Sequence, residues 1–436
     1  MQKKAPKIFI GLRELSGYYA NLKKGFDAHG IESVFVNLSG HPYGYDTGRN
    51  PAWINSFNRT VGTIGSRFFL NFFMRLVWVG LLQNILSFYL FIWALFTFDV
   101  FIFGSNSSFF FFLDLPILKL FRKKIIYVFH GSESRPVYLN GYVINNVKTG
   151  TVWVGIILAR IQKIIISIIE RFADHTISIP PQAYFHSRPF VSWLFIGVPQ
   201  HVETKDSGGD FGDRHDQAIR ILHAPSKPKP KGTVEIRRAI QSLKKKGHIL
   251  DYVEITGKPN NEVLAELKKC DFIVDELYSD TPMAVFATEA AFAGKPAVVG
   301  GYYSENIHQD ITADKIPPSM FCHPDRIEEA IEKMATDKKL RQQMGRDAYE
   351  FVTSNWSSRQ VAGHYLTLIN GACPKEWLYD PHNISYLHGC GLSERTVKLI
   401  IKKFIDTGGK CSLCLSDKPV LERMLIEFAS FHKHHD

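Results

Sequence analysis

One carboxylate stands alone in a segment of small and apolar residues. Glu289 is the only Asp or Glu between Asp280 and Glu305, and it lies in TPMAVFATEAAFAGKPAVVGG, residues 281–301. The small residues around it suit a helix packed tightly on a sheet, and the Pro-Met-Ala turn leads into that helix. N–H groups at a helix start attract phosphate, and a carboxylate one or two turns further can accept hydrogen bonds from ribose hydroxyls. The segment suggests a nucleotide-diphosphate ligand; a buried helix with one exposed Glu is the alternative.

The elements that must position this helix are alternating strands and helices. Strand-like runs rich in Ile, Val and Phe recur in the first 200 residues at 7–12, 32–38, 98–104, 124–131 and 174–179. A second series has strands at 220–226, 251–257, 272–277 and 297–301, and helices at 233–247, 261–271 and 326–356. Apolar strands separated by helices predict buried parallel sheets. We expect an α/β fold with two Rossmann-like, doubly wound domains facing a cleft that binds ligands.

Composition indicates the boundaries between these units. Residues 201–218 are polar, contain glycine and have few apolar side chains, so they predict a linker. We expect a first domain over 1–200, a second over 219–356, and a mostly helical extension over 357–436. A chain of 436 residues agrees with two or three such units.

Positive charge is concentrated in the first domain. The chain has a formal net charge of +10; its first 200 residues hold 20 Lys and Arg against 9 Asp and Glu, whereas the remainder holds 32 against 33. Long apolar runs lie in the same part, and a basic, apolar surface favours an anionic membrane as a partner. Nucleic acid is disfavoured because no base-reading or stacking motif accompanies the charge.

The cysteines and the N-terminus predict the compartment. Six cysteines at irregular spacing favour a reducing environment over a disulfide framework. At the N-terminus, Lys3, Lys4 and Lys7 are followed by only a short apolar run, which predicts a strand instead of a signal peptide. We therefore expect a cytoplasmic chain that associates peripherally with the inner face of the membrane.

The longest uncharged segment raises the question of a membrane span. Residues 76–98 carry no formal charge over 23 positions, which is long enough for a transmembrane helix. A span would carry the next strand to the other side of the bilayer, so we favour a buried or interfacial helix, with a spanning helix as the alternative. Residues 152–174 predict an amphipathic helix. Polar side chains at multiples of four give the uncharged segment a narrow polar stripe: Asn71, Arg75, Gln83 and Ser87.

Several stretches resemble one family of enzymes. HAPSKPKPKGT (223–233), VEITGKPNNEVLAELKKCDFIVDEL (253–277) and MAVFATEAAFAGKPAVV (283–299) look like the donor-domain segments of GT-B glycosyltransferases, most closely family four. In the first domain, YVFHGSESRP (127–136) resembles the HGSD-R loop of a bacterial subset, and Trp356 after the late helix also fits. The resemblance covers roughly residues 7–370.

The resemblance implies a donor site in the second domain and an acceptor site in the first. Glu289 would bind the donor ribose and His130 would stand near the reacting sugar, as the two catalytic residues. Lys231 would pair with the diphosphate, because a fixed cation and helix N–H groups stabilise the charge that builds on the leaving group. The further donor-binding positions are Ser226, Lys227, Thr281, Ala284 and Val285. The further acceptor-side positions are Gly11, Gly17 and Arg135.

The chain departs from the family pattern at three donor positions. Thr281 stands where a second Glu is usual, and Ala284 where the turn usually has a glycine. Ser226 replaces an Arg, although Lys227 and Lys229 are close enough to substitute. No Asp-x-Asp pair occurs in the sequence, so we expect no metal and no cofactor besides the nucleotide sugar, which is a substrate.

The C-terminal part of the chain contains cysteines and histidines, the residue types that bind zinc. CSLC (411–414) lies near Cys390 in sequence and is followed by the terminal HKHHD. A single CxxC without a second pair is weak evidence for zinc, and a His cluster on a frayed helix is the alternative. No metal site is therefore predicted.

These observations predict a glycosyltransferase that moves a sugar from a UDP- or GDP-sugar to a lipid-linked or glycan acceptor at the cytoplasmic membrane face. The resemblance implies retention of anomeric configuration. A sugar-nucleotide epimerase of the same fold is one alternative, against which the apolar segment at 76–98 argues. A catalytically degenerate transferase that acts as a membrane scaffold is another, favoured by Thr281 and Ser226.

Overall fold

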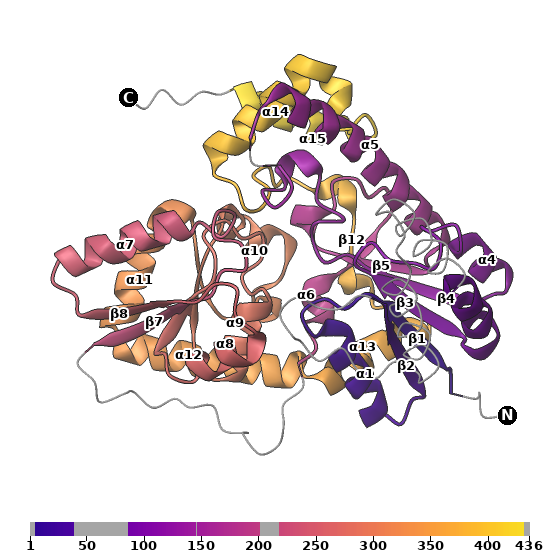
Figure 1. The fold of residues 1–436 in the computed structure, drawn as a ribbon, viewed down its shortest axis with the longest axis horizontal. Coiled ribbons are helices and arrows are strands. Elements are labelled where there is room, and N and C mark those ends of the chain that lie inside the picture. The colour runs from indigo at the N-terminus through magenta and orange to yellow at the C-terminus, as the bar shows by residue number, and fades with distance from the viewer. Residues whose placement is uncertain (1–4, 39–85, 145, 201–217, 431–436) are drawn as a thin grey trace, which may run out of the picture.

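The computed structural model describes residues 5–38, 86–144, 146–200 and 218–430. Two lobes lie side by side, each built on its own sheet (Figure 1). The first lobe, indigo to purple, holds a seven-stranded sheet, and the second, pink to orange, a five-stranded sheet. The expected α/β class with two parallel-sheet domains is confirmed. Nearly all of the predicted linker, residues 201–217, lies outside the described residues.

Apolar runs that are buried on both faces form the first sheet, in the order β12-β6-β5-β4-β3-β1-β2. The rings of Phe9, Phe101 and Phe109 pack inside this domain with centroids 5.2 to 6.3 Å apart. Helical crossovers make six strands parallel: β1 (Ile8–Leu12), β2 (Ser33–Asn37), β3 (Val100–Gly104), β4 (Lys124–Val128), β5 (His175–Ser178) and β6 (Phe190–Ser192).

The second sheet has the order β11-β10-β9-β7-β8, and its strand pairs are parallel. Strand β9 ends at Val274, earlier than the sequence pattern predicts, so Asp275 and Glu276 lie in the loop that follows. Its strands are β7 (Ile219–His223), β8 (Leu250–Glu254), β9 (Phe272–Val274), β10 (Ala297–Gly300) and β11 (Met320–Cys322). Its main helices are α7 (Thr233–Lys245), α8 (Asn260–Leu267), α9 (Val285–Phe292), α11 (Ile327–Thr336) and α12 (Lys338–Asn355).

The chain returns to the first domain through α13 (Ser358–Ile369), which packs along α1 (Tyr18–Ala28). The two helices approach closely because α1 carries Gly25 at the contact. A Cβ atom on Gly25 would lie 1.9 Å from the backbone oxygen of Ser358. The hydroxyl groups of Tyr18 and Tyr365 are 2.9 Å apart across the same contact.

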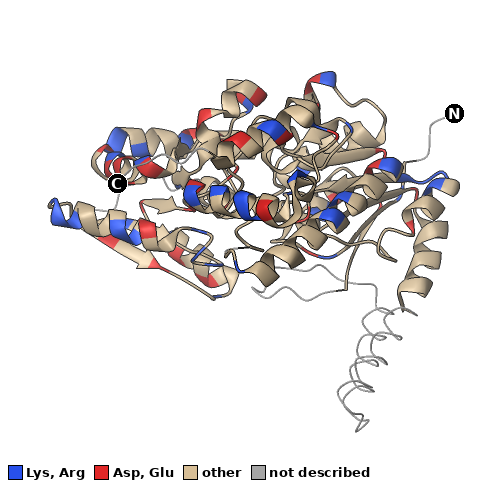
Figure 2. Ribbon diagram, turned by 90° about the horizontal axis from the view of Figure 1, so that it is seen from above, with Lys and Arg blue, Asp and Glu red and all other residues tan. Residues whose placement is uncertain are grey.

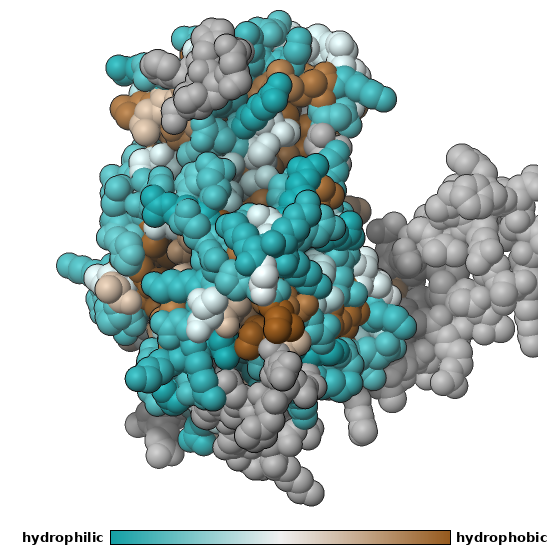
Figure 3. Space-filling view, turned by 90° about the vertical axis from the view of Figure 1, so that its left-hand side faces the viewer, coloured by the Kyte–Doolittle hydropathy of each residue, from teal (hydrophilic) through white to brown (hydrophobic). Residues whose placement is uncertain are grey.

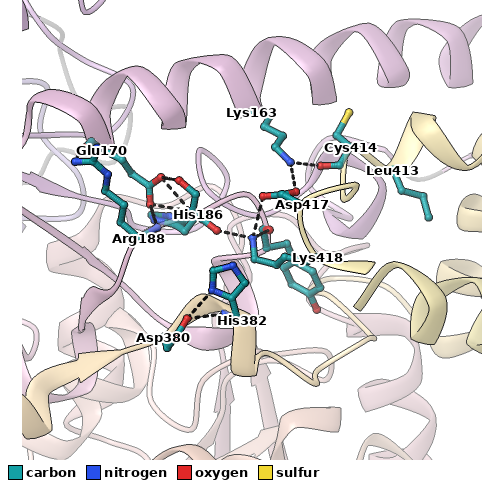
Figure 4. Close-up of polar contacts among 12 residues, drawn as sticks. Lys163, Glu170, His186, Arg188, Asp380, His382, Leu413, Cys414, Asp417 and Lys418 are labelled. Atoms are coloured by element: carbon teal, nitrogen blue, oxygen red, sulfur yellow. Dashed lines mark hydrogen bonds and ion pairs between the residues drawn. The ribbon is translucent and has the colours of Figure 1, made fainter. Parts of the chain in front are cut away.

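The C-terminal extension also belongs to the first domain. Strand β12 (Leu378–Tyr379) pairs antiparallel with β6. Helix α14 (Glu394–Gly408) packs against α5 (Thr149–Phe172), and α15 (Pro419–Ser430) packs against α14, at the top of Figure 1. The buried Lys418 ammonium donates to the carbonyl groups of Tyr184, at 2.8 Å, and His186, as Figure 4 shows in part. These bonds attach the start of α15 to the first domain.

Residues 386–392 of the extension, here called the bridging segment, contact both domains. On the first domain, the Cys390 N–H donates to the Leu139 carbonyl at 3.0 Å. On the second domain, the Gly391 N–H donates to the Tyr278 carbonyl at 2.9 Å. The bridging segment therefore joins the two domains at the edge of their cleft.

One helix in the described part of the chain is long and apolar enough to cross a membrane, by length and composition only. It is α5, with 24 residues and a mean hydropathy of 2.0. Because α5 connects β4 to β5, which pair directly, and packs against α4 (Leu115–Leu120) and α14, it is the crossover helix of one sheet. The described part of the uncharged segment forms the helix Leu86–Thr97, which bears no charged side chain (Figure 2). Asn71, Arg75 and Gln83 lie outside the described residues.

Candidate functional site

A cavity of about 250 Å³ lies between the two domains. Residues that follow parallel strands of both sheets line it, which is where ligands bind in doubly wound folds. The bridging segment adds Cys390 to its wall. Five of the site residues expected from the sequence line this cavity: His130, Arg135, Thr281, Ala284 and Val285.

His130 follows β4 and lies against two tyrosines of α1. Its Nε2 is 2.9 Å from the Tyr19 hydroxyl, and its ring meets the Tyr18 ring edge to face at 4.8 Å. The Glu133 carboxylate accepts a hydrogen bond from the His130 backbone N–H at 2.8 Å and so fixes the turn. Burial lowers the pKa of His130 to about 3, so its imidazole is neutral at physiological pH. A neutral imidazole can hydrogen-bond a sugar hydroxyl without adding charge to the site.

A glutamine of helix α5 hydrogen-bonds the backbone of the loop 130–135. The Gln162 side-chain amide donates to the carbonyl groups of Glu133 at 3.0 Å and Arg135 at 2.8 Å. One amide thus satisfies carbonyl groups that the tight turn leaves without strand partners.

A buried chain of hydrogen bonds holds the same loop at Ser134. His186 Nε2 is 3.1 Å from the Ser134 hydroxyl. On the other side of the ring, His186 Nδ1 is 3.1 Å from the Glu170 carboxylate, a contact that Figure 4 shows. Burial raises the pKa of Glu170, but hydrogen bonds from His186 and Ser187 lower it further, so that it lies below its ordinary value. The order Ser-His-Glu is that of a nucleophile with its base, yet Ser134 and His186 are fully buried. We therefore assign the chain of bonds to holding the loop.

An ion pair between Arg135 and Asp280 crosses the cleft. The Arg135 Nε–H donates to Asp280 at 3.0 Å, a second guanidinium N–H bonds the same oxygen, and Gln182 donates to it at 3.2 Å. Both side chains of the pair are 4% exposed. Burial lowers the pKa of Arg135, but the Asp280 carboxylate outweighs this and raises it above its ordinary value. The pair fixes the His130 loop to the segment that precedes α9.

Lys231 lies in the second domain and is bound by two carboxylates. Its ammonium is 2.9 Å from Asp275 and 3.3 Å from Glu276, and its side chain is 12% exposed. Burial lowers the pKa of Lys231, but the two carboxylates raise it well above its ordinary value, so Lys231 stays charged. Burial also raises the pKa of Glu276, whose other oxygen accepts a hydrogen bond from the Tyr142 hydroxyl at 3.2 Å. Glu276 lines the cavity, so this cluster borders it.

Helix α9 begins at the cavity wall. Its first residue is Val285, and its N-cap residue, Ala284, has no side chain that could accept a hydrogen bond, so the first N–H groups remain available to a ligand. The buried Thr281 hydroxyl lines the cavity and has no hydrogen-bond partner among the described residues. Glu289, one turn beyond Val285, is 9% exposed and accepts a hydrogen bond from the Asn260 amide at 3.2 Å. It is not among the residues that line the cavity.

The other expected site residues lie around the cavity without lining it. Gly11 lies inside β1, where a Cβ atom would be 2.3 Å from the Val36 carbonyl oxygen, so its small size serves the sheet. Gly17 is the N-cap residue of α1, with φ of 80°. Ser226 and Lys227 are exposed in the loop after β7, and the Lys227 ammonium is 5.8 Å from the centre of the Tyr142 ring.

The cavity-lining residues that sequence reasoning missed include Glu276, Asp280, Gln182 and Cys390. Glu276 and Asp280 could have been found, because polar residues after a strand of a doubly wound sheet point to a site. Gln182 and Cys390 gave no comparable signal, since each reaches the cavity only through tertiary packing. The sequence placed Cys390 with the CSLC motif instead.

No group of three or more His, Cys, Asp or Glu side chains in the described residues is arranged to hold a metal ion. The Cys411 thiol donates to the Gly408 carbonyl at 3.0 Å, and the Cys414 thiol is 3.8 Å from the Ser412 carbonyl oxygen. The terminal histidines, from His432 on, lie outside the described residues.

Two facing parallel-sheet domains, a ligand cavity between them and a helix, α13, that returns the chain to the first domain define the GT-B fold. Similar solved structures include an Anabaena HepE protein in complex with UDP and glucose (10% identity, TM-score 0.41, 84% of this chain and 100% of that one). A Burkholderia multivorans trehalose 6-phosphate synthase has 10% identity and a TM-score of 0.48, over 85% and 97% of the two chains. A Rickettsia africae glycosyltransferase has 10% identity and a TM-score of 0.49, over 85% and 99%.

No protein-family model matches the chain, and no curated protein sequence matches it.

Proposed function

We propose that this chain is a glycosyltransferase that takes a UDP- or GDP-linked sugar as donor and a lipid-linked or glycan molecule as acceptor. One observation carries the proposal. The half-buried cation Lys231, which borders the cavity through Glu276, and the uncapped start of α9 lie on the second-domain side of a cavity whose opposite wall is the His130 loop. Anion-binding groups thus face a neutral, hydrogen-bonding wall, which suits a diphosphate leaving group on one side and a sugar on the other.

The proposed transfer breaks the bond between the donor sugar and the diphosphate, forms a bond from the sugar to the oxygen of an acceptor hydroxyl, and passes the proton of that hydroxyl to the departing diphosphate. Negative charge grows on the diphosphate as the bond breaks, and the Lys231 ammonium and the first N–H groups of α9 stabilise that charge. Lys231 exchanges its bonds to Asp275 and Glu276 for bonds to the diphosphate. Burial raises the pKa of Glu276, and an anionic diphosphate close to this carboxyl group would raise that pKa further.

We propose retention of anomeric configuration, no metal, and a peripheral position at the cytoplasmic face of the membrane. The absence of an Asp-x-Asp pair from the sequence supports a metal-independent reaction, with Lys231 providing the positive charge. The excess of basic and apolar residues in the first domain supports the membrane position. Glu289, next to Asn260 at the start of α8, is the proposed contact for the donor ribose.

A catalytically degenerate transferase that acts as a scaffold is the second candidate. Its support is the arrangement around Lys231, which two carboxylates already neutralise, and the hydroxyl of Thr281 in place of a second Glu. Such a protein would bind a nucleotide without turning over a nucleotide sugar.

Binding and turnover separate these candidates. Thermal-shift screening against UDP, GDP and their glucose conjugates is expected to raise the melting temperature with one nucleotide family. Release of the nucleoside diphosphate in a membrane extract that contains acceptors is then expected, and Lys231→Ala should abolish it. Nucleotide binding without release supports the scaffold, and an altered sugar formed from the donor alone supports an epimerase. Failure of UDP and GDP to bind, together with a silent Glu289→Ala variant, would refute the proposal.

A further inference from the structure

Exposed apolar side chains gather on one part of this molecule. Of the 21 large hydrophobic residues that are exposed in the described chain, 16 lie between Phe88 and Ile164. They include Phe96, at 72% exposure, and Phe111, at 88%. The outer face of the second domain is largely hydrophilic by contrast (Figure 3). Soluble proteins seldom expose contiguous apolar surface of this extent without a partner.

Fifteen of these residues, all but Val143, form one continuous surface, here called the apolar face, made of the helix Leu86–Thr97, residues 109–121 and α5. The rings of Phe96 and Phe121 are 6.0 Å apart, which joins the first helix to the end of α4. Helix α4 in turn packs against α5. The outward residues of α5 follow a helical repeat and are all exposed: Trp153, Val154, Ile157, Leu158, Ile161 and Ile164.

The charges of the same region favour an anionic bilayer as the partner. Residues 86–164 contain eight Lys and Arg against three acidic residues, two of which, Asp114 and Glu133, are buried. Arg122 and Arg160 are exposed within the apolar face and have no ion-pair partner among the described residues. A second copy of this chain fits less well, because a two-fold interface would place the same positive patches against each other. Apolar side chains flanked by unpaired Arg match the headgroup and acyl region of an anionic bilayer.

The inner side of α5 connects the apolar face to the proposed acceptor side of the cavity. Gln162, on the side of α5 away from the apolar face, bonds the loop that carries His130 and Arg135. We propose that the apolar face lies on an anionic lipid bilayer. The loop 130–135 is then held by α5 next to the membrane contact, where it can receive an acceptor that is anchored in the same bilayer. This inference rests on the proposed transfer function and specifies the acceptor as lipid-linked.

Vesicle co-sedimentation of the full chain tests the inference. Binding is expected to vesicles with 30% phosphatidylglycerol and to be much weaker with phosphatidylcholine alone. Ile157→Glu with Ile161→Glu should weaken binding on the order of tenfold or more. Arg160→Gln should weaken it roughly fivefold. The matched control is Ile249→Glu, because Ile249 is 62% exposed but lies in the second domain, and it should bind vesicles as the native chain does. Each variant must retain the native circular dichroism and nucleotide binding.

The outcomes distinguish the inference from the proposed function. A chain that binds nucleotide but no anionic vesicle overturns the membrane contact and leaves the transferase proposal standing. Vesicle binding that survives the α5 double variant also overturns it, since another segment then makes the contact. Self-association in sedimentation velocity that the same double variant removes would show that a second copy covers the face. Loss of nucleotide binding in the native chain would instead count against the transferase itself.

Discussion

At the scale of single residues, each cation at the cavity contacts carboxylates that oppose its charge. Asp280 holds Arg135, and Asp275 with Glu276 holds Lys231. Removal of one member leaves a buried charge without its partner, which is costly, whereas a ligand phosphate can replace a carboxylate at Lys231. The departures from the family pattern, such as Thr281, therefore occur in a site whose charges are already balanced.

Lys231→Ala is expected to weaken UDP or GDP binding by roughly 10- to 100-fold, because a hydrogen bond to a charged group contributes about 1.5–3 kcal/mol. Isothermal titration calorimetry would measure the change. Lys245→Ala is the matched control, since Lys245 is an exposed lysine at the end of α7 in the same domain and should bind with native affinity. Equal affinities in the two variants would remove Lys231 from the donor site.

Acid should destabilise the fold through His223, which is fully buried and lies 2.8 Å from the Val274 carbonyl oxygen and 2.9 Å from the Thr233 hydroxyl. Burial lowers the pKa of His223 from 6.5 to about 4. Between these values the unfolded chain binds the proton first, so stability is present above pH 6.5 and falls as the pH drops toward 4. The loss is expected to reach about 3 kcal/mol at pH 4.

His223→Gln removes this titration and should flatten the dependence of stability on pH, even if it lowers stability at pH 7. Urea unfolding of both proteins at pH 7 and pH 4.5 would measure the two slopes. A variant that loses as much stability as the native chain between these pH values would show that other groups cause the acid effect.

At the scale of secondary structure, the sequence predicted nine of the twelve described strands, because most of them are short apolar runs, but it did not predict β6, β11 or β12. The runs at 7–12 and 124–131 contain β1 and β4; the first ends with β1 at Leu12, whereas the second extends past the end of β4 at Val128. Strand β12, with two residues, carried no signal, because its pairing with β6 depends on the packing of the whole extension.

For the candidate site, the sequence likewise predicted residues that follow a strand but not the partners that only tertiary packing brings to them. His130 and Arg135 were found because they follow an apolar strand, where a doubly wound fold places ligands. The partners of Arg135 and Lys231 were not found, since they depend on how the two domains meet. Asp280 lies 145 positions after Arg135 in the chain, and no local pattern links two such positions.

Gly25→Ala tests the packing of α1 on α13. The added methyl group would lie 1.9 Å from the Ser358 backbone oxygen, so the helices must separate, at a cost of about 1–3 kcal/mol. Gly150→Ala is the matched control in another helix, because no heavy atom lies within 4 Å of its added Cβ. The control should be neutral or stabilise by up to about 1 kcal/mol. Chemical denaturation would compare them, and a neutral Gly25→Ala would contradict the observed helix contact.

At the scale of the whole molecule, the two domains are held together by contacts at the cleft and by the bridging segment. The cavity of about 250 Å³ is slightly smaller than typical ligand pockets of roughly 300–1,000 Å³. We therefore expect the domains to part when a complete nucleotide sugar enters, and the Arg135–Asp280 pair lies where that motion begins.

Asp280→Asn is expected to lower the free energy of unfolding by about 3–5 kcal/mol, because the Arg135 guanidinium stays buried without a counter-charge. It should also raise the radius of gyration in small-angle X-ray scattering without nucleotide. Asp251→Asn is the matched control, since its pair with Arg220 is partly exposed and should contribute less than about 1 kcal/mol. An unchanged radius of gyration would show that the bridging segment alone holds the cleft closed.

The return of the chain to the first domain has a consequence for synthesis on the ribosome. Strand β12 and helices α13 and α14 come from the last part of the chain, whereas the second domain is continuous from β7 to α12. Since domains fold as units while the chain emerges, the second domain can be complete before the first has received its final elements. During that interval the nascent first domain lacks the helix that covers the inner part of α5. A chaperone or the membrane itself would then be needed to shield α5 until α14 has been synthesised and packs against it.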